Sequence, residues 1–599
     1  MGRTGGTTMA RTAPKVDVVF VGVGFTAAII ARELKGASVR MVGLERGRGR
    51  YTVPDFQSPA MHDELQYAVR HGIMQDLSKE TVTFRNRPDQ KALPMRQLGS
   101  FLPGTDLGGA GVHWNGQTFR FQEADFRWRS HHEERYGRGF IPEELTVQDW
   151  GITYQDLEPH YDRFDYLCGI GGYAGNIKGE IRPGGNPFES PRSRDYPNPP
   201  TKPAYLGVLF AQAAMELGYS PYQVPSANMT APYTNPEGVR LESCMVCGYC
   251  ERFGCEHFAK ASPQTTLLPV VLQQKNFELR TGAHVIRVDL TDDKKHATGV
   301  TYVDVATGEE VTQPAELVVL SAFSFHNPRL MLLSGIGRPY DPATGQGVVG
   351  RNYAYQTMSA VSLFYDDDVH LNQFMGAGAL GTVVSDYVGD NYDHSKLGFI
   401  GGAYIAAYTT GMRPIEAHPV PPGTPRWGLG WKKAVARHYN HTGALQCHGQ
   451  SNATRTNHLD LDPTYKDAYG QPLLRMTFDF PKNDVAFSNY VTDRAEEIAL
   501  RMGARQVLAT RRSTPYSVVP YQTTHNTGGA IMGADPRTSA CNRFGQTWDV
   551  PNVFVTGAAL FPQNASYNPT ATVGALAFWE AAAIRDRYLN APGAPLVPP

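Results

Sequence analysis

The chain has 599 residues, is 41% hydrophobic and 19% charged, and carries a formal net charge of -1. A chain of this length is too long for one ordinary compact domain, so we expect two domains. The balanced charge and the lack of a basic run argue against nucleic acid as a ligand and favour a small molecule.

The longest apolar stretch, residues 18–31, is interrupted by Gly22 and Gly24. It is shorter than the roughly 20 residues that a membrane-spanning helix requires, so we expect membrane contact only through partners. The amino-terminal sequence MGRTGGTTMARTAPK has neither twin arginines nor an apolar signal core. Export to the periplasm would therefore need a partner's signal, and without a partner the chain would stay in the cytoplasm.

A β-α-β unit is predicted near the amino terminus. Residues 16–22 are typical of a strand, FTAAIIAREL of a helix, and residues 38–45 of a second strand. The turn has the pattern G-x-G-x-x-A, formed by Gly22, Gly24 and Ala27. Small residues there let the backbone approach a pyrophosphate, whose charge is stabilised by the N–H groups at the helix start.

Glu45 ends the second predicted strand, 23 residues beyond Gly22. A carboxylate at this place accepts hydrogen bonds from ribose hydroxyls and disfavours a 2′-phosphate. The pattern indicates a dinucleotide site but does not choose between NAD and FAD. A tight turn without a ligand is the alternative.

Later segments divide between this nucleotide domain and a second one. Residues 170–240 are dense in Pro, Gly and Asn and predict loops outside the nucleotide domain. Residues 277–288, the strand-like 316–322 and the helix-like NPRLMLLSG indicate a return to it. Strands such as LLRMTFDF and a helix over 484–502 are predicted for the second domain.

Four further segments carry a resemblance to a known family. They are GGAGVHWNG from Gly108, NPRLMLLSGIG from Asn327, VVGRNY from Val348, and the block 525–579 with HNTGGAIMG, VPNVFVTGAALFP and YNPTATVGALAFWEA. The sequence resembles the glucose–methanol–choline (GMC) oxidoreductases, although Asn327 replaces a small hydroxyl residue usual there. Within that family, FLPGTDLGGAGVHWNG, SHHEERYG, PSANMTAPYTNPEG, CMVCGYC and QTTHNTGGAIMG are similar to the gluconate 2-dehydrogenase flavoproteins.

This resemblance implies FAD and a mixed α/β fold: a discontinuous Rossmann-like FAD-binding domain and a substrate domain on a mainly antiparallel sheet. The FAD-binding domain is expected over 1–150, 275–350 and 515–599, and the substrate domain over 151–274 and 351–514. Besides the glycine motif and Glu45, the resemblance places the cofactor against these residues: Gly108, Gly109, His113, Asn115, Val285, Gly557, Ala558, Pro569 and Thr570.

Alcohol oxidation by flavin requires a base for the hydroxyl proton and a hydride acceptor. His525 is the candidate base, since an imidazole titrates near working pH. Asn568 lies where the family has its second active-site residue, and its amide can donate to the forming alkoxide. A helix beginning at Pro569 and Thr570 would stabilise reduced flavin through its N-terminal N–H groups. A packed histidine without a catalytic role is the alternative for His525.

His113 occupies the place where related sugar dehydrogenases and pyranose oxidases attach FAD covalently, within the phrase GGAGVHW. The resemblance therefore implies a histidyl–flavin bond. The alternative is a histidine that only packs against the flavin or forms a hydrogen bond with it.

Seven cysteines form an odd, clustered set that does not indicate a secreted disulfide framework. Those at 168, 447 and 541 read as packed thiols. In segment 244–263, C-x2-C-x2-C-x4-C is close to the ferredoxin spacing C-x2-C-x2-C-x3-C. An iron–sulfur cluster of three or four irons, a structural zinc site, and thiols without metal stay open. The four candidate ligands are Cys244, Cys247, Cys250 and Cys255.

The resemblance implies a membrane-associated subunit that converts D-gluconate to 2-keto-D-gluconate at the periplasmic face. Its implied partners are a multihaem cytochrome c subunit and a small signal-bearing subunit. Because electrons would pass from flavin to haem one at a time, this role favours an iron–sulfur cluster over zinc at the four cysteines. No C-x-x-C-H phrase occurs, so haem would lie on the partner. Two alternatives stay open. One is a dehydrogenase or oxidase of another sugar or polyol (sorbitol, 2-ketogluconate, fructose, glucose). The other is a non-catalytic electron-transfer or nucleotide-sensing protein. Candidates for binding the substrate carboxylate, left unranked, are Lys432, Arg455 and Arg475.

Overall fold

The structure is a computed structural model that describes residues 11–57, 63–97 and 99–598. The predicted absence of an export signal falls largely on residues 1–10, which lie outside the described residues. Among the described helices, none is both long and apolar enough to cross a bilayer.

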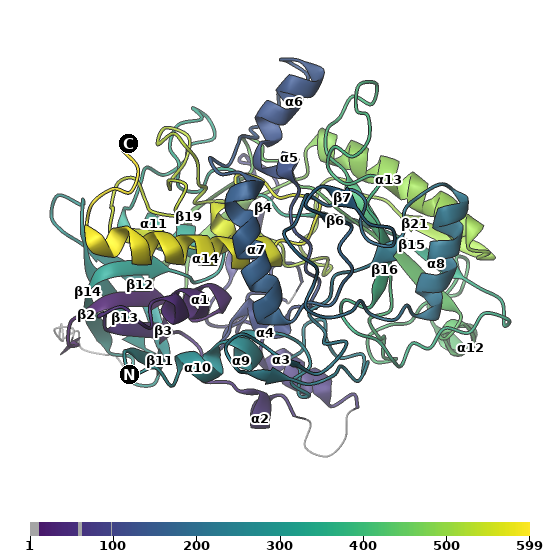
Figure 1. Cartoon of the computed structure of the whole chain (residues 1–599), viewed down its shortest axis with the longest axis horizontal. Coiled ribbons are helices and arrows are strands. Elements are labelled where there is room, and N and C mark those ends of the chain that lie inside the picture. The colour runs from purple at the N-terminus through teal and green to yellow at the C-terminus, as the bar shows by residue number, and fades with distance from the viewer. Residues whose placement is uncertain (1–10, 58–62, 98, 599) are drawn as a thin grey trace.

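A parallel sheet forms one half of the molecule, at the left of Figure 1. Its strand order is β11-β3-β2-β14-β22. The strands are β11 (Phe277–Thr281), β3 (Met41–Glu45), β2 (Val16–Val21), β14 (Glu310–Leu320) and β22 (Val553–Val555). The β-branched residues of β2 and of the second half of β14 are buried, as expected for strands covered on both faces.

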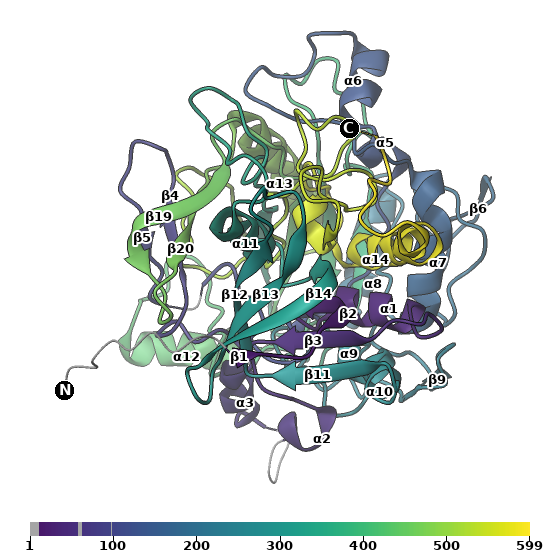
Figure 2. The ribbon, with the colours of Figure 1, turned by 90° about the vertical axis from the view of Figure 1, so that its left-hand side faces the viewer.

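Helices cover one face of this sheet, and an antiparallel meander lies at the other side, as Figure 2 shows. The covering helices are α1 (Phe25–Glu33), α14 (Thr570–Asp586) and α7 (Tyr154–Cys168). A Cβ at Gly574 of α14 would stand 2.1 Å from the Phe164 ring, so glycine permits the close contact of α14 with α7. The meander consists of β12 (Ala283–Leu290), β13 (Ala297–Asp304) and the first half of β14, and α11 (His326–Ser334) packs on it.

An antiparallel sheet forms the other half, at the right of Figure 1. Helices α13 (Lys482–Arg501) and α8 (Tyr205–Glu216) pack against it around a second apolar core. In order, its strands are β21 (Gln506–Thr510), β15 (Thr357–Phe364), β18 (Thr442–Gly449), β17 (Ala403–Tyr408), β16 (Gly381–Val384) and β8 (Tyr222–Gln223).

A smaller sheet has the order β19-β20-β4-β5. Its strands are β19 (His458–Lys466), β20 (Pro472–Thr477), β4 (Val82–Arg85) and β5 (Leu93–Pro94). Segments from the predicted FAD-binding and substrate domains thus share one sheet. The exact division into domains stays a prediction.

The remaining elements are short or peripheral. The helices are α2 (Thr52–Asp55), α3 (Gln66–Gly72), α4 (Ala110–His113), α5 (Glu123–Phe126), α6 (Trp128–Tyr136), α9 (Pro263–Thr266), α10 (Leu268–Val271), α12 (Gly428–His438), η1 (Gly557–Leu560) and η2 (Tyr588–Asn590). The strands are β1 (Arg11–Thr12), β6 (Asn176–Ile177), β7 (Glu180–Ile181), β9 (Tyr233–Thr234) and β10 (Arg240–Leu241).

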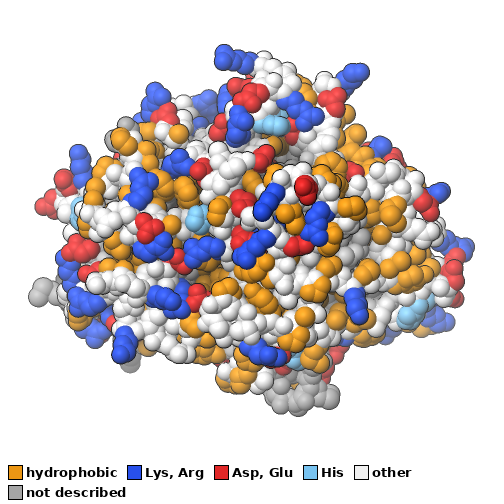
Figure 3. Space-filling view, in the orientation of Figure 1, with side chains coloured by type: hydrophobic (Ala, Val, Ile, Leu, Met, Phe, Trp, Pro, Cys, Tyr) orange, Lys and Arg blue, Asp and Glu red, His pale blue; other side chains and the backbone are white. Residues whose placement is uncertain are grey.

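The predicted mixed α/β class is confirmed: the largest sheet is mixed, with a parallel part and an antiparallel meander, and the sheet of the other half is antiparallel. The helix predicted over 484–502 is α13, and the second predicted strand is β3, which begins at Met41 rather than at residue 38. Helix α8 was not expected inside the loop-rich region. Its run YLGVLFAQAAME is rich in helix formers, but it stands among Pro- and Gly-rich stretches that outweighed it. On the face in Figure 3, charges of both signs are interspersed.

Candidate active site

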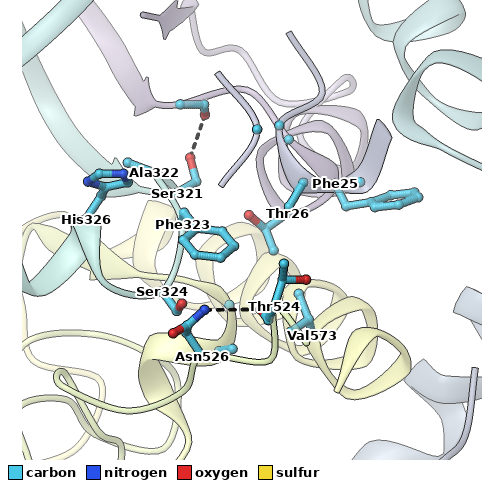
Figure 4. A pocket seen from close by; sticks show the side chains of 18 of the residues that line it. Phe25, Thr26, Ser321, Ala322, Phe323, Ser324, His326, Thr524, Asn526 and Val573 are labelled. Carbon is cyan, nitrogen blue, oxygen red and sulfur yellow. Dashed lines mark hydrogen bonds between the residues drawn. The ribbon is translucent and has the colours of Figure 1, made fainter. Parts of the chain in front are cut away.

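One cavity of about 320 Å³ joins the two halves of the molecule, within the range of small-molecule sites. Its first end, here called the nucleotide end, is lined by Gly22, Glu45 and Val285. Its second end, the catalytic end, is lined by His448 and His525. In Figure 4, Thr26, Phe323 and Thr524, from three separate segments, lie around the same space.

The nucleotide end is built on the turn from β2 to α1. Gly22 has φ +87°, and a Cβ there would stand 2.9 Å from the backbone Cα of Ala322, so only glycine fits. The Ser321 hydroxyl donates to the Gly22 carbonyl at 2.7 Å. Gly24 precedes α1 and lines the cavity, which places the helix N-terminus at the cofactor side. Ala27 is buried in α1 and does not line the cavity, so its small size serves helix packing instead.

Glu45 is buried at the end of β3 and lines the cavity. Its Oε2 accepts from the Val23 N–H at 3.0 Å and its Oε1 from the Gly47 N–H at 3.0 Å. Burial raises the pKa of this carboxyl, against the lowering by these two N–H groups. Glu45 therefore braces the glycine turn, and it faces the space in which a ribose would lie.

A second glycine turn packs on the first. Gly108 has φ +92° and its N–H donates to the Val23 carbonyl at 2.8 Å, and Gly109 has φ +54°. Both glycines line the cavity together with Asn115. Two glycine segments more than eighty residues apart in sequence thus meet at one surface without side chains between them.

A partly buried ionic cluster lines the nucleotide end, and the sequence patterns did not predict it. Glu80 binds Arg46 closely and Arg329 at 2.8 Å, and Arg329 also binds Asp467 at 2.7 Å. These four side chains line the cavity with His326, which appears in Figure 4. No local motif marks them, because they come from separate segments.

The carboxy-terminal segment supplies the wall near the catalytic end. Gly557 has φ +83° and begins η1 together with Ala558. Helix α14 begins at Thr570 directly after Pro569, as predicted, and both residues line the cavity. The N-terminus of this 17-residue helix therefore faces the space where negative charge on a reduced flavin would be stabilised.

His525 lines the catalytic end, and its ring is oriented by Gln356. The Gln356 amide donates from Nε2 to the Ser566 carbonyl at 3.0 Å, which turns its Oε1 towards Nδ1 of His525. An amide oxygen only accepts, so Nδ1 carries the hydrogen and Nε2 is left as the acceptor. His525 is thus held in the tautomer that a general base requires.

His448 on β18 is a neighbour of His525 that the sequence patterns did not predict. The two ring centroids are 6.5 Å apart, and the His448 ring stacks on Tyr404 at 5.2 Å. Burial lowers the pKa of His448 to about 4, and burial together with His448 lowers the pKa of His525 to about 3. Both rings are therefore neutral at working pH. His448 and Gln446 line the cavity at alternating positions of one strand.

Asn568 also lines the catalytic end, but its amide already has protein partners. Its Oδ1 accepts from the Tyr404 hydroxyl at 2.7 Å, and its Nδ2 donates to Gln117 Oε1 at 3.1 Å. Tyr408 donates to the same Gln117 oxygen at 2.9 Å. One of the two Asn568 N–H groups is thus committed, and the other is left for a substrate oxygen.

His113 ends α4, lines the cavity and is 3% exposed. Its Nε2 is buried without a hydrogen-bond partner among the described residues. Burial, with Lys260 nearby, lowers its pKa to about 3. A neutral ring nitrogen without a protein partner fits a contact or a bond with flavin.

The four clustered cysteines are free thiols that line one small cavity with Lys260. Within the described ranges, no three His, Cys, Asp or Glu side chains are placed to hold one metal ion. Four thiols that share one cavity are the donor type that both a zinc site and an iron–sulfur cluster take, so both stay predictions. The segment adjoins the flavin loop, since the Arg252 N–H donates to the His113 carbonyl at 2.8 Å.

The residues suggested for the substrate carboxylate lie away from the cavity. Arg475 forms an ion pair with Asp460 at 2.6 Å, Arg455 donates to the Pro342 carbonyl, and Lys432 lies on α12, which has no buried residue. None of the three is among the described lining residues.

Comparisons with known proteins agree with this site. The model of the GMC oxidoreductase family matches residues 206–358 and 453–577. The chain is 50% identical to the gluconate 2-dehydrogenase flavoprotein of Pantoea cypripedii, over 99% of this chain and 97% of that protein. The chain belongs to the GMC oxidoreductase family. It is therefore an FAD-dependent oxidoreductase that acts on CH–OH groups.

Other relatives are more distant. The 2-methyl-1,2-propanediol dehydrogenase of Mycolicibacterium austroafricanum is 30% identical over 95% of each chain. The fructose dehydrogenase large subunit of Gluconobacter japonicus is 24% identical over 96% of this chain and 99% of its own. The crystal structure of pyridoxine 4-oxidase from Mesorbium loti is similar in fold, with a TM-score of 0.58 and 16% identity over 95% of this chain and 99% of that one.

Proposed function

We propose that this chain is the flavoprotein subunit of a dehydrogenase that oxidises D-gluconate to 2-keto-D-gluconate. The observation that carries the substrate is the 50% identity over nearly the whole length of both chains. The cavity agrees with a polar substrate, because its catalytic end is lined by amide, hydroxyl and imidazole groups. Gln446, His448 and Asn568 offer hydrogen-bond donors and acceptors that suit a polyhydroxy acid.

The chain's own residues account for the proton chemistry. His525 accepts the substrate hydroxyl proton at Nε2, because Gln356 keeps the hydrogen on Nδ1. The uncommitted N–H of Asn568 donates to the same substrate oxygen as negative charge develops on it. Bound FAD supplies the acceptor for the hydride from the carbinol carbon. Gln356 and Tyr404 act by holding these two side chains in place.

We propose further that FAD is attached covalently through His113. Support comes from the buried Nε2 without a protein partner at the cavity wall. Acid precipitation of the purified protein should leave yellow flavin on the polypeptide. In a His113→Ala variant the flavin should move to the supernatant. Release of all flavin from the unaltered protein would show that the bond is absent.

The cysteine segment is proposed to hold an iron–sulfur cluster that passes electrons to a multihaem cytochrome c subunit. Cys244, Cys247, Cys250 and Cys255 line one cavity next to the flavin loop. The Val246 N–H donates to the Cys244 sulfur at 3.4 Å and the Asn228 amide to the Cys250 sulfur at 3.7 Å. Hydrogen bonds of this kind to sulfur tune cluster potentials. The complex would lie at the periplasmic face of the membrane, exported with a signal-bearing subunit.

Anaerobic mixing with gluconate tests the substrate. The flavin absorbance should bleach rapidly with gluconate and slowly with sorbitol, fructose, glucose or 2-ketogluconate. If one of these compounds bleaches the flavin faster than gluconate does, that compound is the substrate instead. If neither gluconate nor any of them bleaches the flavin, a non-catalytic role is favoured. Rapid reoxidation by dioxygen with hydrogen peroxide release would identify an oxidase rather than a dehydrogenase.

Iron and zinc analysis of anaerobically purified protein tests the relay. Iron with an electron paramagnetic resonance signal is expected, and stoichiometric zinc without iron would contradict it. Replacing Cys247 by Ser should slow electron delivery to the acceptor while flavin reduction by gluconate stays fast. Replacing the isolated Cys447 by Ser serves as the matched control.

A further inference from the structure

Lys260 is a buried lysine between the flavin loop and the cysteine segment. Its side chain is 1% exposed and lines the same small cavity as the four clustered cysteines. Its backbone is fixed by a bridge to Asn228. Lysine is almost never fully buried unless it is paired, so its position requires a physical reason.

The hydrogen bonds of Lys260 identify its charge state. The Nζ atom donates to the carbonyl oxygens of Trp114 at 2.5 Å, Cys250 at 2.9 Å and Phe253 at 2.8 Å. Carbonyl oxygens only accept, and only an ammonium has three hydrogens to donate to three of them. Lys260 is therefore a cation, and it ties the flavin loop to the cysteine segment.

This cation has no carboxylate partner among the described residues. Other buried cations of the molecule are paired, as Arg120 and Arg192 are with Asp165 at 2.6 Å and 2.8 Å. A buried charge without a counter-charge is strongly unfavourable. Two kinds of group that share its cavity can supply negative charge: the Glu256 carboxylate, and the four cysteine sulfurs as thiolates.

We propose that Lys260 is a fixed positive charge that compensates the cysteine thiolates and raises the reduction potential of the cluster they hold. The inference rests on the iron–sulfur relay of the proposed function. When bound, the cluster would supply one-electron transfer: it would take the two electrons of reduced flavin one at a time and pass each to the one-electron acceptor, and the protons of the reduced flavin would be released to solvent. A nearby positive charge stabilises the reduced, more negative cluster, so Lys260 favours the transfer from flavin, and it keeps its proton throughout.

The test compares Lys260→Met with Lys260→Arg, which keeps the charge, and with Lys275→Met. Lys275 is exposed, so its replacement changes the net charge equally at a distant place. The midpoint potential of the cluster is measured by electron paramagnetic resonance during a redox titration of the intact flavoprotein, and iron is measured separately. Lys260→Met should make cluster reduction at least about tenfold less favourable, which is about 59 mV for one electron. In Lys260→Arg and Lys275→Met, the midpoint potential of the cluster should stay near that of the unaltered protein.

The possible outcomes separate the two proposals. Absence of iron from the unaltered protein would contradict the proposed iron–sulfur relay itself. Iron present with an unchanged midpoint potential in Lys260→Met would overturn only the role of the lysine. Loss of the cluster from Lys260→Met with retention in Lys260→Arg would support the need for charge. Loss from both variants would show that the exact lysine geometry, not its charge, is what matters, and would overturn the inference.

Discussion

The two ends of the cavity are built in different ways. At the nucleotide end, glycine backbone and one bracing carboxylate, Glu45, form the turn beside the ionic cluster described above, and this turn and its brace lie within one β-α-β unit. At the catalytic end, side chains are positioned by hydrogen bonds from other side chains: Gln356 orients His525, and Tyr404 positions Asn568. The first end can place a cofactor, and the second supplies His525, whose ring is oriented to take a substrate proton. Changes at the first end should therefore remove flavin, and changes at the second should slow a flavin-loaded enzyme.

The largest effect is expected from Gly22→Ala. Its φ of +87° and the 2.9 Å approach of a Cβ to the Ala322 backbone force the turn to move, at a cost of about 1–3 kcal/mol. The purified variant should contain almost no flavin and show no activity, as measured by flavin absorbance per polypeptide. Gly36→Ala is the matched control, because a Cβ there meets nothing within 4 Å. Full flavin content in Gly22→Ala would contradict the comparison of the two ends.

His525→Ala should give the opposite result: full flavin content with slow chemistry. A positioned general base contributes about 10² to 10⁴ in rate, so anaerobic flavin reduction by gluconate should slow by that factor. His71→Ala, at an exposed histidine on α3, is the control and should react normally. Unchanged reduction rates in His525→Ala would remove this residue from the mechanism.

Gln356 variants should have a smaller effect that reports on the orientation of His525. Gln356→Leu removes the acceptor for Nδ1–H, a bond of about 1 kcal/mol, so kcat should fall by about tenfold or less with flavin retained. Gln356→Glu places a carboxylate beside the ring and should raise the pKa of His525 from about 3. The acid limb of the kcat/KM profile should then move to higher pH. An unmoved limb would show that Gln356 has only a packing role.

The same contrast explains which parts were predictable from the sequence. Gly22, Gly24 and Glu45 lie within one local β-α-β unit, so their spacing carries the information. Gln446 and His448 reach the cavity that His525 lines through strand pairing of β18 with β15 and β17, which the sequence does not specify. The only local signal was alternation of polar residues in the strand LQCHG.

Asn568 and the cysteines were found through motifs, but their partners were not. The Tyr404 and Gln117 contacts of Asn568 join segments far apart in the chain. The residues suggested for binding the substrate carboxylate do not line the cavity, for a related reason. Charge type alone pointed to arginine and lysine of the second domain, and Arg475 instead satisfies Asp460 within its own sheet.

The effect expected to be smallest at neutral pH comes from His448 and concerns stability at acid pH. Burial lowers the pKa of His448 from 6.5 to about 4, so the folded state holds this ring neutral while the unfolded chain binds a proton below pH 6.5. Its contribution to stability is complete above pH 6.5 and is lost as the pH falls to about 4. The slope is at most about 1.4 kcal/mol per pH unit for one histidine.

His448→Gln keeps a polar side chain that does not titrate in this range, so the difference in unfolding free energy between variant and unaltered protein isolates this one group. Denaturant unfolding at pH 7, 6 and 5 should show the unaltered protein losing stability faster than the variant. Parallel losses would mean that His448 has no perturbed pKa in the folded protein. The same variant should also raise the pKa of His525, since His448 helps to lower it. The acid limb of kcat/KM should move to higher pH, less than in Gln356→Glu, because a distant ring is replaced rather than a full negative charge placed at Nδ1.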